Sequence, residues 1–123
     1  MHLDFDPAKK EAEQTSFEQF LKVDIRIGEV IEAIDFPEAK KASYKLRINF
    51  GEGVGIKKSS AQLTTHYSKQ DLIGKRVLAV VNFPPRQIGK YMSEVLVLGL
   101  SDQNNDIVLF ELDKLVPNGA RLH

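Results

Sequence analysis

The chain has 123 residues, of which 42% are hydrophobic and none is cysteine, and its 17 basic and 17 acidic residues balance to zero net charge. This length suits one compact domain, and the lack of cysteine excludes disulfides, thiolate metal sites and a cysteine nucleophile. Because no apolar run is long enough to span a bilayer and the first residues do not resemble a signal peptide, we expect a cytoplasmic protein without membrane insertion.

The first predicted elements are short helical turns. Asp6-Pro7 is a favourable start for a short helix, and Ser16 is followed three residues later by Gln19, which is the spacing of a capping box. A small apolar stripe follows Ser16 and consists of Phe17, Phe20 and Leu21. We therefore predict an N-terminal extension over residues 1–15 and a domain over residues 16–123.

The next segments alternate apolar and polar residues, as half-buried strands do. In the first, from Val23 onward, the alternation is lost after Gly28, which predicts a long strand bent by a β-bulge. The second strand, over residues 44–50, alternates cleanly and has a basic polar face. GEGVG at residues 51–55 then predicts a hairpin turn into a third strand around residues 54–58.

Residues 61–74 have no long helical period, but Ser68 is predicted to cap a short helix over KQDL that Gly74 ends. Three short apolar runs are then predicted to be strands, at residues 77–81, 95–100 and 107–112. Residues 82–94 hold two adjacent prolines between apolar runs, so we predict a surface loop there.

These elements match an all-β fold, a five-stranded OB-fold Greek-key barrel with short helical segments at the N-terminus and after the third strand. A generic small β-barrel or sandwich is the alternative, because the number of strands does not determine their topology.

Catalytic and metal-binding patterns are weak. His2, His66 and His123 have no metal-ligand spacing, and GEGVG precedes no helix and so is not a phosphate loop. The acidic residues are concentrated at the two ends of the chain and not in apolar surroundings. We therefore predict a protein that is not an enzyme and has no cofactor or metal site.

Charge is distributed unevenly along the chain. Residues 1–39 contain 4 basic and 10 acidic residues, residues 40–92 contain 11 and 2, and residues 93–123 contain 2 and 5. The basic middle block indicates an anionic partner, although a solvated face, or one paired with the acidic ends, is an equal alternative on charge alone.

The basic block also contains hydroxyls, amides and aromatic rings, a mixture typical of nucleic-acid contacts. The cations are Lys57, Lys58, Arg86 and Lys90; the polar residues are Ser59, Gln62 and Asn82; the rings are Tyr67, Phe83 and Tyr91. Each has a structural alternative, because such rings are often core residues, such serines often lie in turns, and such an asparagine often satisfies loop backbone.

Several blocks of this chain resemble the tRNA-binding domain family, which occurs as free-standing proteins and as appendages of some aminoacyl-tRNA synthetases. The matching blocks are F-x-x-F-x-K-V-D-I-R-x-G from Phe17, S-S-A-Q-L from Ser59, L-I-G-K-R-V from Leu72, and N-F-P-P-R with S-E-V-L-V-L from Asn82. Within this family the chain resembles the CsaA branch of export chaperones. The resemblance implies an OB-fold, a homodimer without catalytic activity, tRNA as a ligand in the wider family and unfolded or precursor polypeptide in the CsaA branch.

The family's binding signature falls on Asn82, Pro85, Arg86 and Ser93, all of which are present. The chain departs from many relatives at Lys90 and at Val95-Leu96, where those relatives carry glycine and a glycine-methionine pair. These departures favour the CsaA branch over selective tRNA recognition, because valine restricts the backbone more than glycine does.

The resulting hypothesis is a dimeric chaperone for protein export with tRNA-binding capacity, and a dedicated tRNA-binding protein is the alternative. The secretion machinery is a further possible partner. We expect the dimer interface at the two termini, where a barrel this small leaves apolar residues for a partner to cover. These residues are Phe17, Phe20, Leu21, Leu115, Val116 and Leu122.

Overall fold

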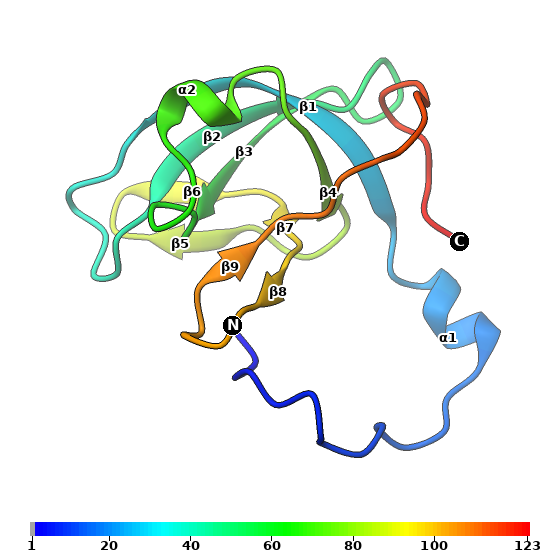
Figure 1. The fold of residues 1–123 in the computed structure, drawn as a ribbon. Helices are drawn as coiled ribbons and strands as arrows, with labels where there is room; N and C mark the ends of the chain where they lie inside the picture. The colour runs from blue at the N-terminus through cyan, green and yellow to red at the C-terminus, as the bar shows by residue number, and fades with distance from the viewer. Residues whose placement is uncertain (1) are drawn as a thin grey trace.

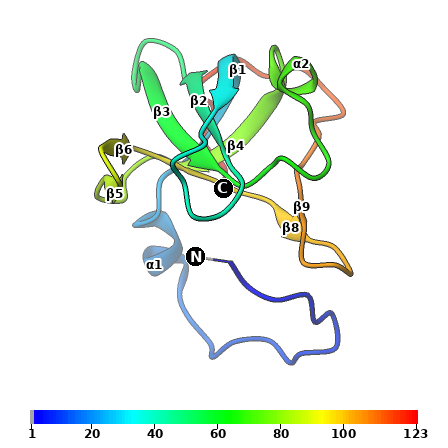
Figure 2. The same ribbon diagram turned by 90° about the vertical axis from the view of Figure 1, so that its left-hand side faces the viewer.

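The computed structural model describes residues 2–123 and contains one curved antiparallel sheet of five strands. The strands are β1 (Ile25–Asp35), β2 (Tyr44–Asn49), β3 (Ile56–Ala61), β4 (Arg76–Val80) and β7 (Leu96–Val97), in the spatial order β3-β2-β1-β4-β7. Figures 1 and 2 show the sheet curling on itself. The edges meet where Glu94 N–H donates to the carbonyl of Lys58 at 2.8 Å. The prediction of an all-β, five-stranded OB-like barrel is thus confirmed.

Two hairpins and two short helices surround the barrel. β5 (Arg86–Ile88) pairs with β6 (Tyr91–Ser93), and β8 (Leu100–Ser101) pairs with β9 (Ile107–Val108). α1 spans Phe17–Leu21 and α2 spans Lys69–Leu72. No helix within residues 2–123 has the length and apolar character needed to cross a membrane.

Local signals placed most of these elements correctly. The register of β1 against β2 shifts between Val30 and Glu32, which is the predicted bulge. Ser68 and Asp71 form a complete capping box at the start of α2. At α1 only half of the box forms, because the Gln19 side chain accepts from the Thr15 hydroxyl instead of reaching back to Ser16.

Four predictions need correction. The run at 95–100 is not one strand, because it divides into β7, which pairs with β4, and the start of β8, which pairs with β9. Asp6-Pro7 opens a single turn and not a helix, closed by Lys9 N–H on the Asp6 carbonyl. Residues 82–94 are not an irregular surface loop, because they contain the β5–β6 hairpin, which turns at Gly89 with a φ of +60°, and Ser93 within it is buried. The run at 107–112 is a strand only over β9, because Leu109 N–H donates to the Tyr67 hydroxyl at 2.9 Å and not to a strand partner.

The core lies inside the curved sheet. Its fully buried side chains include Val30 of β1, Leu46 and Ile48 of β2, and Phe50 just after β2. Along β2 the alternating apolar residues face this interior, and the polar residues between them face outward. The same alternation that builds the core therefore places the basic residues of β2 on the outer surface.

Candidate nucleic-acid interface

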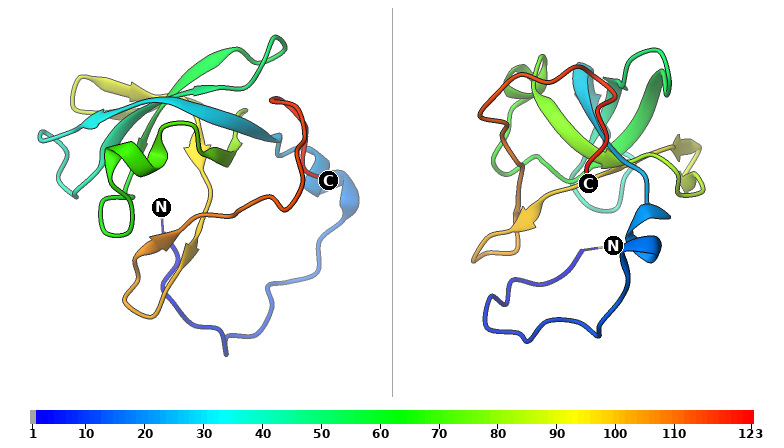
Figure 3. Two further views of the ribbon diagram at one scale, coloured as in Figure 1. Left: turned by 45° about the horizontal axis from the view of Figure 1, so that its top comes forward. Right: turned by 90° about the vertical axis from the view of Figure 1, so that its right-hand side faces the viewer.

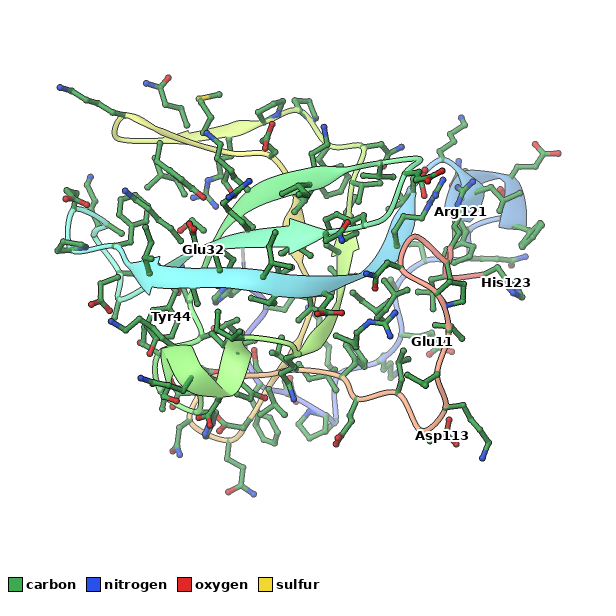
Figure 4. The ribbon with its side chains drawn as sticks, turned by 90° about the horizontal axis from the view of Figure 1, so that it is seen from above. Glu11, Glu32, Tyr44, Asp113, Arg121 and His123 are labelled. Atoms are coloured by element: carbon green, nitrogen blue, oxygen red, sulfur yellow. The ribbon has the colours of Figure 1, made fainter. Side chains whose placement is uncertain are left out.

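The outer face of β2 and β3 carries a group of cations. Arg47 is paired with Lys58 and Lys45 with Ser60, and residues paired across antiparallel strands project from the same face. Leu46 and Ile48, between them on β2, are buried. Glu32 of β1 borders this face, with its carboxylate 4.0 Å from the Arg47 guanidinium (Figure 4).

The β5–β6 hairpin adds the Tyr91 ring to this face, and Phe36, just after β1, packs against it. The ammonium groups of Lys58 and Lys45 lie 5.1 and 5.2 Å from the centre of the Tyr91 ring. The Phe36 ring meets Tyr91 edge-on at 5.3 Å and has the Lys45 ammonium 4.7 Å from its centre. These four residues, Phe36, Lys45, Lys58 and Tyr91, form a cluster that we call the aromatic–lysine cluster, and its cation–π contacts fix the two lysines at the surface.

Tyr91 keeps its proton at all physiological pH values. Burial raises its pKa to about 12, and the negative charges of Glu94 and Glu32 add to this effect. The ring is therefore neutral and retains the electron-rich face to which the Lys45 and Lys58 ammonium groups are attracted.

Two residues of the predicted signature hold the fold together through their side chains. The Asn82 Oδ1 accepts from Asp24 N–H at 2.9 Å, and its Nδ2 donates to the Lys22 carbonyl at 2.8 Å. The Ser93 Oγ is buried and accepts from Ser60 N–H at 3.0 Å. Asn82 thus ties the end of β4 to the α1–β1 junction, and Ser93 ties β6 to β3.

The other predicted residues divide into exposed and internal ones. Arg86 and Pro85 are exposed, and Arg86 is paired with Ser93 at the base of the hairpin. Lys90 is exposed at the hairpin turn. Ser59 is fully buried and donates to the Val95 carbonyl at 2.9 Å, so its hydroxyl faces the barrel interior.

Lys57 and Gln62 lie away from the aromatic–lysine cluster. Lys57 is paired with the buried Ile48, so it projects from the inner face of β3 while Lys58 projects from the outer face. Gln62 is half-buried and lines a small pocket beside Lys41. Of the four cations singled out in the sequence, only Lys58 belongs to the cluster. Arg86 lies exposed on the adjoining hairpin, paired with Ser93, whose hydroxyl accepts from Ser60 N–H.

For two of the rings, Tyr67 and Phe83, the burial of the side chain distinguishes a core residue from a surface residue. Tyr67 is partly buried and packs against the core, so the structural alternative holds for it. Phe83 remains 42% exposed. Phe36 carries no local signal in the sequence, because it follows β1 in an apparent loop. Lys45 is marked only by the alternation of β2, which places it on the basic face.

One grouping brings together side chains that are far apart in the sequence. His66, Asp102 and Asp106 have ligand atoms within 4.8 Å of one another, and the His66 Nε2 lies 2.6 Å from the Asp102 Oδ2. The other Asp102 oxygen accepts from Asn104 N–H at 2.9 Å and from Asp106 N–H at 3.0 Å. The arrangement holds the turn at residues 102–106 in place.

Most of the apolar side chains predicted for the dimer interface are exposed. Phe17 is 67% exposed and Leu115 is 91% exposed, and Leu21, Val116 and Leu122 are also exposed, whereas Phe20 is half-buried. Leu122 N–H donates to the Ile25 carbonyl at 2.8 Å, so the C-terminal segment runs beside the start of β1, next to α1 (Figure 3).

Asn82→Ala is expected to lower the free energy of unfolding by about 1–2 kcal/mol, because two hydrogen bonds to backbone groups of the α1–β1 junction are lost. Thermal or urea unfolding measures the effect. Gln87→Ala is the matched control, since the Gln87 amide bonds only within its own hairpin, to the Gly89 carbonyl. An unchanged midpoint in Asn82→Ala would show that the side chain has no structural role.

Comparisons with known proteins identify the family and the fold. The family model described as "Putative tRNA binding domain" matches residues 25–121. The crystal structure of the chaperone CsaA from Bacillus anthracis is 45% identical, with a TM-score of 0.84 over 90% of this chain and 100% of that one. The CsaA chaperone protein from Picrophilus torridus is also 45% identical, with a TM-score of 0.83 over 89% of this chain and 100% of that one.

Among curated relatives, the methionine–tRNA ligase of Porphyromonas gingivalis is 35% identical over 96 residues. The match covers 78% of this chain but only 14% of the ligase, so the chain spans about a seventh of that protein's length. The family that matches is defined by a binding domain and not by a catalytic centre. On the strength of a family model that covers residues 25–121, this chain belongs to the tRNA-binding domain family.

Proposed function

We propose that this protein binds tRNA through the outer face of β2 and β3 and the adjoining β5–β6 hairpin. The observation that carries the proposal is the aromatic–lysine cluster, in which Lys45 and Lys58 lie against the Phe36 and Tyr91 rings. Lysine ammonium groups neutralise phosphates, and the half-buried Tyr91 ring can stack on an unpaired base. Phe36 is 5% exposed and packs edge-on against Tyr91. Among residues 2–123 neither these lysines nor Arg86 forms an ion pair, so the three charges are available to an anion.

The salt dependence of binding tests this proposal. If Lys45, Lys58 and Arg86 each contact a phosphate, the logarithm of the association constant should fall with the logarithm of salt concentration with a slope of roughly −2, at about 0.7 per contact on a single strand. Fluorescence anisotropy with labelled tRNA between 50 and 300 mM salt measures the slope. A flat dependence, or no binding at low salt, would refute phosphate recognition by this face.

We further propose that the protein is a cytoplasmic homodimer that binds unfolded or precursor polypeptides during export. The support for this second function is the 45% identity to the two CsaA chaperones and the apolar surface at the termini. On this proposal residues 1–15 are an extension and residues 16–123 are the binding domain. The secretion machinery would be the partner that receives the bound polypeptide.

Phe17→Asp is expected to convert the dimer to a monomer at micromolar concentration, because it places a charge in the apolar surface that the partner copy would cover. Light scattering measures the mass. Ile34→Asp is the matched control, since Ile34 is exposed at the far end of β1 from α1. A monomer mass for the unmodified protein would reject the homodimer.

A further inference from the structure

The N-terminal arm, residues 2–6, is bound to the β8–β9 hairpin through main-chain groups. The Leu3 carbonyl accepts from the Ser101 hydroxyl at 2.8 Å, and Phe5 N–H donates to the Asn105 Oδ1 at 2.6 Å. The carbonyl of one residue and the N–H of the residue two positions later lie on the same edge of an extended chain. The hairpin therefore contacts one edge of the arm's backbone.

Side chains of the arm contribute little to this contact. Leu3 is 85% exposed and Phe5 is 40% exposed, although both are large apolar residues. A site that contacts the backbone and leaves the side chains in solvent accepts many sequences, as in recognition by strand addition.

The segment that joins the arm to α1 leaves the arm free to detach. Residues 7–15 are all exposed, and their hydrogen bonds are local, such as Lys9 N–H to the Asp6 carbonyl. Figures 1 and 2 show this segment as a wide loop that stands away from the barrel. No core residue lies in the arm or the loop, so releasing the arm leaves the barrel intact.

The hairpin turn that receives the arm is held by several hydrogen bonds. Asn105 N–H donates to the Asp102 carbonyl and Asp102 N–H donates to the Asp106 carbonyl, both at 2.9 Å. His66 and Thr65 anchor the turn from outside, through Asp102 at 2.6 Å and Asp106 at 3.1 Å. Asn105 has a φ of +62°, a conformation that asparagine tolerates better than most residues. With this backbone conformation, the Asn105 side chain reaches the N–H of Phe5 in the arm.

The arm ends beside the basic block. His2 lines a pocket of about 170 Å³ together with Lys41, Gln62 and Asn105. Burial lowers the pKa of His2, and the positive charges of Lys41 and Arg86 lower it further, which agrees with this position. A polypeptide in the place of the arm would run from the hairpin turn toward the pocket that Lys41 and Gln62 line.

We propose that Ser101 and the turn at residues 102–106 form a binding site for an extended polypeptide segment, and that the arm occupies this site as an intramolecular ligand. The outside ligand is any extended chain with a free carbonyl and N–H at the spacing of Leu3 and Phe5. The identity of that outside ligand rests on the proposed binding of unfolded or precursor polypeptides. The arm then acts as an intramolecular competitor, which a client polypeptide displaces from the site.

The test uses the full chain and a labelled peptide of residues 2–9, HLDFDPAK. Phe5→Pro removes the N–H that Asn105 accepts and should free the site. A tethered arm has an effective concentration of about 1 mM, so a site with a peptide Kd near 0.1 mM would be about 90% occupied in the unmodified protein. We expect Phe5→Pro to bind the peptide about tenfold more tightly than the unmodified protein. Glu11→Pro is the matched control, because Glu11 lies in the exposed loop, and it should bind the peptide no more tightly than the unmodified protein does.

A second substitution tests the site itself. Asn105→Gly, added to Phe5→Pro, removes the acceptor but keeps the positive φ, and should weaken peptide binding at least tenfold. A peptide with proline in place of the phenylalanine should not bind. The inference is overturned if Phe5→Pro binds no better than the unmodified protein, or if Asn105→Gly has no effect.

Capture of a reduced, unfolded model protein by the unmodified chain is measured separately. If the arm peptide binds as expected and no unfolded protein is captured, the chaperone proposal fails and the arm site stands. If unfolded protein is captured equally by Phe5→Pro and by Phe5→Pro with Asn105→Gly, the client site lies elsewhere and the displacement of the arm by clients is rejected.

Discussion

Exchanging Lys58 and Arg86 together for glutamate is expected to lower the affinity for tRNA at least about a hundredfold at low salt. Each substitution removes a cation from the proposed interface and adds an anion that repels phosphate, and each contact contributes roughly a factor of ten. Lys58 also loses its contact with the Tyr91 ring, which lies 5.1 Å from its ammonium group. The slope of the salt dependence should become shallower by about 1.4, because two phosphate contacts on a single strand are lost.

Lys9→Glu with Lys10→Glu is the matched control for this experiment. Both lysines are exposed in the N-terminal loop, and the pair makes the same change in net charge. If tRNA binding depended on total charge alone, the control would weaken binding as much as the test variant. Full tRNA affinity with an unaltered slope in the Lys58→Glu and Arg86→Glu variant would mean that the basic face is only solvated surface.

Phe50→Ala is expected to lower the free energy of unfolding by about 3–5 kcal/mol, the usual cost of truncating a fully buried phenylalanine. Phe50 is 1% exposed, and its ring lies so close to β1 that a side chain on Gly28 would come within 2.7 Å of it. Its N–H also donates to the Gly55 carbonyl at 2.9 Å, which closes the β2–β3 turn. A domain of this size has a total free energy of unfolding of about 5–15 kcal/mol, so the substitution removes a large part of it.

Chemical unfolding monitored by circular dichroism measures this loss. Phe83→Ala is the matched control, because Phe83 is 42% exposed at the surface and its truncation should change stability by less than about 0.5 kcal/mol. Similar losses of unfolding free energy for the two variants would mean that burial of the Phe50 ring does not stabilise the fold as expected.

Much of the fold could be read from local sequence because its causes are local. The clean alternation of residues 44–50 gives β2 one apolar and one basic face, and the broken alternation after Gly28 marks the bulge of β1. Ser68 and Asp71 need only their own four-residue segment to form the capping box of α2. The β5–β6 hairpin was missed because two prolines hide the short alternation that follows them.

The candidate site was predictable in composition but not in arrangement. Lys57 and Lys58 are neighbours in the sequence, yet they project from opposite faces of β3, and only the pairing of β3 with β2 decides which of them reaches the outer face. Asn82, Ser59 and Ser93 have the chemistry of ligand-binding residues, but their partners are main-chain groups between 33 and 60 residues away. Such long-range pairings leave no local signal.

The sequence by itself therefore determined the class of the fold, the strands and the presence of a basic surface, since alternation, capping and charge are properties of short segments. Only the tertiary structure decided which residues meet. It brought Phe36 to Tyr91 and placed the N-terminal arm against the turn at Asn105. The physical reason is that strand register and barrel closure are set by the packing of the whole core, so contacts between distant segments follow from all the strands together.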